Sequence, residues 1–142
     1  MNTKEHALKI FEFLKQNKPA EFFDELNNLN SGMRYILVFL YETKNEVYAS
    51  TLSTNMKISR ARVAILIKKL LSKNFITKQV SDTDARKEVL QITTLGIKQV
   101  ENGNKLFLER LERMIEKFGF EKINAFIETA NDIKNFILEE TK

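Results

Sequence analysis

Two short helical patterns, separated by two residues and followed by two short β-patterns, constrain the fold more than any other feature of this chain. The first helix is expected over 49–56, with Ser50 as its N-cap. A tight turn at 57–58 leads to Ser59, which is expected to cap a second helix ending near Lys73. Apolar residues of this second helix recur at helical spacing and predict one buried face: Val63, Leu66, Ile67 and Leu70.

The β-patterns cover Phe75–Val80 and Lys87–Ile92, and a polar segment from Ser81 to Arg86 separates them. The segment is longer than a two-residue turn, so the sequence predicts a hairpin with an extended loop.

Helices are expected on both sides of this central region. An apolar stripe predicts a helix over 4–17, which Pro19 should end, and a short helical turn over 22–29. The very apolar stretch over 33–43 predicts a buried helix.

Two longer helices are predicted after the hairpin. The first begins at about Thr94, with Thr93 or Thr94 as its cap, runs to about Lys117 and ends at Gly119. The second covers about 121–139 and carries a wide apolar stripe: Ile123, Phe126, Ile127, Ala130, Ile133, Phe136 and Ile137.

The chain of 142 residues is long enough for one domain with a sizeable core. We expect a mainly α (α+β) fold in which 1–142 form a single domain. Within it, 33–95 should form a compact lobe, while 1–30 and 105–142 should supply dimerisation helices. The last helix has an apolar stripe too wide for one small lobe to cover, which favours an obligate homodimer.

Positive charge is concentrated in one part of the chain. The overall net charge is only +4, yet residues 57–88 hold nine basic side chains against three acidic ones. A local basic patch is typical of nucleic-acid binders, although a lysine-rich solvated surface would give the same composition. The nine are Lys57, Arg60, Arg62, Lys68, Lys69, Lys73, Lys78, Arg86 and Lys87.

The order of helix, turn, helix and hairpin is that of a winged helix-turn-helix, whose second helix enters the DNA major groove. Charge and topology agree, because the basic residues fall on the second helix and around the hairpin. We therefore expect double-stranded DNA as the partner.

The sequence resembles the MarR family of bacterial transcription regulators over roughly 29–118. Residues 52–59 and 63–70 are similar to that family's helix-turn-helix. Asp84-Ala-Arg86, followed by Ile92-Thr-Thr-Leu-Gly96, is similar to its wing signature, an Asp-x-Arg followed by Leu/Ile-Thr-x-x-Gly.

The sequence departs from the family pattern at several places. Ala85 stands where a second arginine is usual, Asn74 where a glycine ends the recognition helix, and Ile65 where a polar or basic residue often faces DNA. The first thirty residues, with Pro19, are shorter or more broken than the family's first helix.

The absence of cysteine and of a signal-peptide pattern favours a cytoplasmic protein. The resemblance implies a bacterial regulator that binds a pseudo-palindromic operator as a homodimer. It also implies that a small ligand in a cleft between the dimer helices and the DNA-binding lobe weakens DNA binding. Repression is the expected mode, with activation left open, and constitutive binding without a ligand is almost equally compatible with the sequence.

The residues expected to contact DNA lie opposite the buried face of the second helix and in the hairpin loop. Ala61 and Ile65 are suited to thymine methyl groups, which predicts an A+T-rich operator, while Ile65 as a tolerated surface residue is the alternative. Two roles are open for Arg86, and they need not exclude each other: it reaches into the minor groove, or it pairs with Asp84 to hold the loop. The full set is Ser59, Arg60, Ala61, Arg62, Ile65, Lys68, Lys69, Asp84, Arg86 and Lys87.

Other classes of function fit the sequence less well. The one histidine, His6, lies near a terminus, and the four glycines form no phosphate-binding loop. With no cysteine, thiol sensing is impossible and a tetrahedral zinc site is implausible. We expect no enzymatic activity, no cofactor and no response to zinc or peroxide. A winged-helix module that binds proteins instead of DNA is the remaining alternative.

Overall fold

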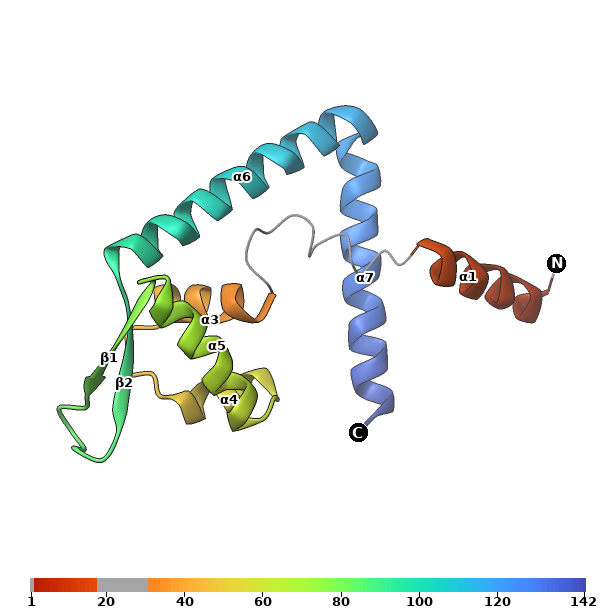
Figure 1. The fold of residues 1–142 in the computed structure, drawn as a ribbon. Helices are drawn as coiled ribbons and strands as arrows, with labels where there is room; N and C mark the ends of the chain where they lie inside the picture. The colour runs from red at the N-terminus through yellow and green to blue at the C-terminus, as the bar shows by residue number, and fades with distance from the viewer. Residues whose placement is uncertain (1, 18–30) are drawn as a thin grey trace. The chain divides into compact units, whose positions relative to one another are not determined.

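The computed structural model describes residues 2–17 and 31–142 (Figure 1). The fold is mainly helical with one two-stranded antiparallel sheet, as the sequence predicts. The predicted break at Pro19 and the turn over 22–29 lie outside the described residues. The elements are α1 (Thr3–Asn17), α3 (Ser31–Glu42), α4 (Ala49–Met56), α5 (Arg60–Ser72), β1 (Ile76–Val80), β2 (Glu88–Ile92), α6 (Thr94–Phe118) and α7 (Phe120–Glu140).

By its internal contacts the chain divides into two compact units, residues 1–101 and 102–142. In the first unit, α3, α4 and α5 lie beside the β1–β2 hairpin (Figure 1). These four parts form what we call the winged lobe. The second unit contains most of α6 and all of α7.

The turn between α4 and α5 is built as the sequence predicts. Lys57 adopts the left-handed conformation with φ 55° and ends α4. The Ser53 hydroxyl donates to the Ile58 carbonyl at 2.7 Å, which ties the last turn of α4 to the start of the next element. Ser59 caps α5, since its hydroxyl accepts from the Arg62 N–H at 3.1 Å.

The predicted N-cap of α4 is wrong by two residues. Tyr48, not Ser50, has the extended backbone that precedes the helix, with φ −111° and ψ 163°. The Tyr48 N–H donates to the Thr51 hydroxyl at 3.3 Å. Ser50 already lies within the first turn of α4.

The core of the winged lobe is apolar and draws on every element of it. The predicted inner face of α5 is buried, and α3 supplies Ile36 and Leu37, which are completely buried. Burial of side chains of this size supplies about 1.5–3 kcal/mol each. Their partners in the core include Leu52, Val63, Leu66, Ile67, Leu70, Ile76, Leu90 and Val100.

A short third strand-like segment joins the hairpin. β1 and β2 pair from Ile76 opposite Ile92 to Val80 opposite Glu88. On the other side of β2, Val47 forms a β-bridge with Leu90, whose N–H donates to the Val47 carbonyl at 2.8 Å. The loop before α4 is therefore fixed to the hairpin.

The Thr-x-x-Gly segment joins the end of α5 to the start of α6. The Thr93 hydroxyl donates to the Asn74 carbonyl at 2.7 Å and accepts from the Gly96 N–H at 3.0 Å. Thr93 is thus the residue that caps α6. Asn74, which stands where the family has a glycine, is left-handed with φ 61°. A Cβ at Gly96 would lie 2.2 Å from the Phe75 carbonyl oxygen, so only glycine fits there.

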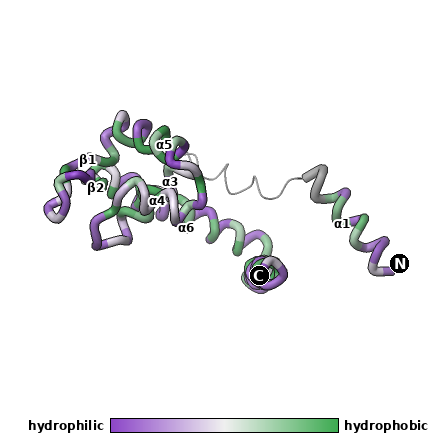
Figure 2. The backbone as a smooth tube through the Cα atoms, turned by 90° about the horizontal axis from the view of Figure 1, so that it is seen from below, coloured by the Kyte–Doolittle hydropathy of each residue, from purple (hydrophilic) through white to green (hydrophobic). Residues whose placement is uncertain are grey.

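The helices outside the winged lobe keep large apolar side chains exposed. Hydrophobic and hydrophilic residues alternate along α1 and α6 (Figure 2). Gly119, with φ 91°, separates α6 from α7. No helix in the described ranges is long and apolar enough to cross a membrane. Exposed apolar residues of α7 include Phe126, Ile127, Ile133, Phe136, Ile137 and Leu138.

Candidate nucleic-acid interface

Helix α5 divides its side chains between the core and the solvent. The face opposite Val63 and Leu70 is exposed along its length. Its start is held by Ser59, which is exposed but has its hydroxyl engaged as the helix cap. The predicted contact residues on this helix are all exposed: Arg60, Ala61, Arg62, Ile65, Lys68 and Lys69.

Ile65 is the unusual member of this face. Its side chain is 56% exposed between basic residues, whereas isoleucine is among the residue types most often buried. Ala61 and Lys68 lie on the same side of the helix at helical spacing. The exposed face therefore combines methyl groups, which can contact thymine methyls, with positive charges, which can contact phosphates.

Asp84 and Arg86 pair in the hairpin loop. Arg86 Nε lies 3.1 Å from Asp84 Oδ1, Arg86 Nη2 lies 3.4 Å from Oδ2, and the Arg86 backbone N–H also donates to Oδ1 at 3.0 Å. These hydrogen bonds from Arg86 hold the pKa of Asp84 below its ordinary value. The pairing of Arg86 with Asp84, one of the two roles that the sequence left open for Arg86, is therefore present. The paired arginine side chain remains 90% exposed.

Lys87, the third predicted wing residue, is engaged by an aromatic ring. Its ammonium lies 4.8 Å from the centre of the Tyr48 ring, a cation–π contact. Tyr48 is the N-cap of α4, so this contact links the hairpin to the helix-turn-helix.

A second group of side chains, at the start of the hairpin loop, was not anticipated from the sequence. Glu46 Oε2 accepts hydrogen bonds from the Tyr48 hydroxyl, from Ser81 Oγ at 2.9 Å and from Thr83 Oγ1 at 3.3 Å. These donors, Tyr48 first, lower the pKa of Glu46. Glu46 and Ser81 are 35 residues apart, and no spacing rule connects them.

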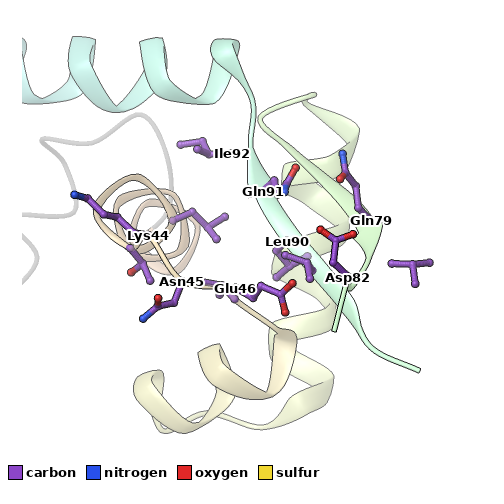
Figure 3. Close-up of a pocket in the computed structure, with 13 residues that line it drawn as sticks. Lys44, Asn45, Glu46, Gln79, Asp82, Leu90, Gln91 and Ile92 are labelled. Atoms are coloured by element: carbon purple, nitrogen blue, oxygen red, sulfur yellow. The ribbon is translucent and has the colours of Figure 1, made fainter. Parts of the chain in front are cut away.

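Glu46 lies on the wall of a groove between the loop after α3 and the hairpin. The groove has a volume of about 410 Å³. Figure 3 shows Lys44, Asn45 and Glu46 on the loop side, with Gln79, Asp82 and Gln91 on the hairpin side. The Glu46 carboxylate points toward the hairpin, near Asp82 (Figure 3).

Comparison with known proteins finds similarity in structure only. No family model matches the chain, and no curated protein matches its sequence. Among solved structures, the MarR family transcription regulator SP03579 is 14% identical, with a TM-score of 0.79, and the match covers 98% of this chain and 97% of that one.

A second similar structure is MepR, a transcription regulator of the Staphylococcus aureus multidrug efflux pump MepA. It is 18% identical with a TM-score of 0.63, and 96% of this chain and 99% of that chain are covered. A MepR variant bound to an oligodeoxyribonucleotide is 17% identical with a TM-score of 0.60, over 96% and 99% of the two chains. MepR bound to ethidium bromide is 18% identical with a TM-score of 0.57, over 96% and 97%.

The architecture and these matches define the class: the chain has a winged helix-turn-helix fold. Within that class, its fold is the one found in MarR-family transcription regulators, as the sequence resemblance implied.

Proposed function

We propose that this chain is a sequence-specific DNA-binding transcription regulator. The observation that carries the proposal is the exposed face of α5. Arg60, Arg62, Lys68 and Lys69 are presented to solvent there by a helix whose other face is buried in the winged lobe. In this fold the second helix of the pair enters the major groove. The MepR variant bound to an oligodeoxyribonucleotide has the same fold, which supports DNA as the partner.

Arg86 and Lys87 extend the proposed contact beyond the major groove. A wing reaches the flanking minor groove or backbone, where A-tracts concentrate negative potential and favour arginine. Arg86 is exposed while its Nε is held by Asp84, so its guanidinium is already oriented before DNA arrives. We propose an A+T-rich, pseudo-palindromic operator, since Ala61 and Ile65 offer methyl groups to thymines.

A homodimer is part of the proposal, and it would account for the exposed apolar side chains of α7. Ile133 and Ile137, one helical turn apart, are 54% and 53% exposed, and Leu8 of α1 is 61% exposed. Burying such surface against a second copy is favourable by about 25 cal/mol per Å². A two-fold axis would also place two recognition helices on two half-sites of the operator.

Repression, with release by a small apolar ligand, is the finer part of the proposal. MepR has been solved with ethidium bromide bound, and that complex supports an aromatic effector for this fold. A ligand that binds one of two conformations more tightly would shift the equilibrium between DNA-binding and released states.

The alternative function is a winged-helix module that binds another protein and has lost DNA binding. A mobility-shift assay with duplex DNA from upstream of the chain's own gene separates the two functions. A DNA-binding regulator shifts this duplex in preference to scrambled DNA, and its affinity falls steeply with salt because phosphate contacts release counterions. Absence of any shift at low salt would refute the proposed function.

A further inference from the structure

The wing is held by one carboxylate that lies outside it. Glu46 belongs to the loop before α4, and its neighbour Val47 is bridged to Leu90 of β2. This backbone link fixes Glu46 relative to the hairpin. The Glu46 side chain then reaches the loop at the end of β1, where Ser81 and Thr83 donate to its Oε2.

Ser81 connects the Glu46 carboxylate to the backbone of the loop. It is a buried polar residue, only 6% exposed, at the start of the wing loop. While its hydroxyl donates to Glu46, the same oxygen accepts from the backbone N–H of Thr83 at 3.2 Å and of Asp84 at 3.3 Å. The hydroxyl of Ser81 therefore joins the Glu46 carboxylate to two consecutive amides of the loop.

The chain of contacts ends at Arg86. Asp84, whose amide is held by Ser81, accepts from both the backbone and the side chain of Arg86. The Lys87 N–H closes the loop by donating to the Asp84 carbonyl at 3.0 Å. An unbroken series of hydrogen bonds thus runs from Glu46 through Ser81 and Asp84 to Arg86.

The negative charge of Glu46 suits it to this position. An ionised carboxylate accepts hydrogen bonds and donates none, so the hydroxyl groups of Tyr48, Ser81 and Thr83 meet no competing donor at Glu46. Hydrogen bonds to a charged acceptor are roughly twice as strong as those between neutral groups. A glutamine of the same shape would present a weaker acceptor oxygen to Tyr48, Ser81 and Thr83.

We propose that Glu46 is a positioning residue that sets the conformation of the wing loop, and through it the placement of Arg86 for contact with DNA. The inference deepens the proposed function and rests on it. The proposed role runs against simple charge repulsion, because the negative charge of Glu46 repels phosphate. By simple electrostatics, removing its charge would strengthen DNA binding.

The decisive variant is Glu46→Gln, with Glu42→Gln as its matched control. Glu42 is an exposed carboxylate at the end of α3, and among the described residues it has no hydrogen bond to the hairpin. We expect Glu46→Gln to bind duplex DNA from upstream of the chain's own gene about tenfold more weakly. Glu42→Gln should bind equally or slightly more tightly, since only a repulsive charge is lost.

Amide hydrogen exchange without DNA provides the second measurement. In Glu46→Gln the Thr83 and Asp84 amides should exchange about tenfold faster, while α5 amides such as Leu66 keep their protection, because only the wing opens. A general loss of stability would instead raise exchange in both places. A double-mutant cycle with Ser81→Ala should be non-additive, because both residues belong to one chain of contacts.

The outcomes separate the inference from the function on which it rests. Unchanged exchange in the wing of Glu46→Gln overturns the inference, whatever the DNA result. Faster exchange with unaltered DNA affinity also overturns it, because Arg86 would then need no positioning. If the unmutated chain shifts no DNA, the proposed function fails, and the exchange data alone decide whether Glu46 holds the wing.

Discussion

Arg86 lies against Asp84 with its Nε 3.1 Å from Oδ1, yet 90% of the arginine side chain remains exposed to solvent. The same carboxylate oxygen accepts the Arg86 backbone N–H. Asp84 therefore holds both the backbone and the side chain of Arg86. An exposed ion pair of this kind contributes little to stability. The pair is therefore better explained as a means of orienting the Arg86 side chain than as a means of stabilising the fold.

Replacement of Arg86 should therefore separate DNA binding from folding. Arg86→Ala is expected to keep the melting temperature within a few degrees while weakening operator binding by at least about tenfold, or about 1.4 kcal/mol. The dependence of affinity on salt should become shallower, because a lost cation reduces counterion release. Thermal unfolding and mobility shifts across a salt series measure both quantities.

Asp84→Ala is the companion variant and should be less harmful to binding than Arg86→Ala. Normal binding by Arg86→Ala together with impaired binding by Asp84→Ala would exclude the minor-groove role.

The ion pair between Asp84 and Arg86 also predicts how the Asp84 carboxyl group titrates. Because Arg86 lowers the pKa of Asp84, the pair's contribution is present above the ordinary carboxyl range and is lost as pH falls through the lowered value. In Arg86→Ala that pKa should rise, as NMR titration can measure.

The close approach at Gly96 predicts a destabilised variant. A Cβ there would lie 2.2 Å from the Phe75 carbonyl oxygen and 2.7 Å from Ile92 Cγ1. Gly96→Ala must separate α6 from the segment before β1 and should cost about 1–3 kcal/mol or more. Lys98→Ala, an exposed change in the same helix, should remain within about 0.5 kcal/mol of the unmutated chain. Denaturant unfolding compares the two, and equal stability would contradict the steric argument.

The apolar surface of α7 predicts an obligate dimer. Ile133→Asp or Ile137→Asp should abolish both dimerisation and DNA binding, because a carboxylate cannot be buried unpaired in an apolar interface. Asn135→Asp adds the same charge about 200° around the helix from either isoleucine and should leave the dimer intact. Sedimentation measures the oligomeric state. A stable folded monomer of the unmutated chain at micromolar concentration would end this proposal.

The exposure of Ile65 predicts that the operator is recognised partly by thymine methyl groups. Replacing the contacted thymines with uracil removes those methyls without altering the hydrogen-bonding edges of the bases. Binding should weaken at one or more positions within the half-sites. If uracil is neutral at every position, Ile65 is only a tolerated surface residue.

Local structure in this chain is determined largely by the sequence. The cap at Ser59, a cap at Thr93 or Thr94, the tight turn at 57–58 and the stripe that buries Val63 all follow from short-range rules. These rules work because a cap or an apolar face depends on residues within one or two turns of each other. The rules failed at the N-cap of α4, which was predicted to be Ser50 and is Tyr48.

The wing support was decided only by the tertiary structure. Glu46 meets Ser81 because Val47 pairs with Leu90, and a β-bridge between distant segments leaves no periodic signal in the sequence. Whether Arg86 pairs with Asp84 likewise depended on the folded loop. Hydrogen bonds that cross 35 residues depend on the path of the backbone, whereas caps and apolar stripes depend on composition within a few residues.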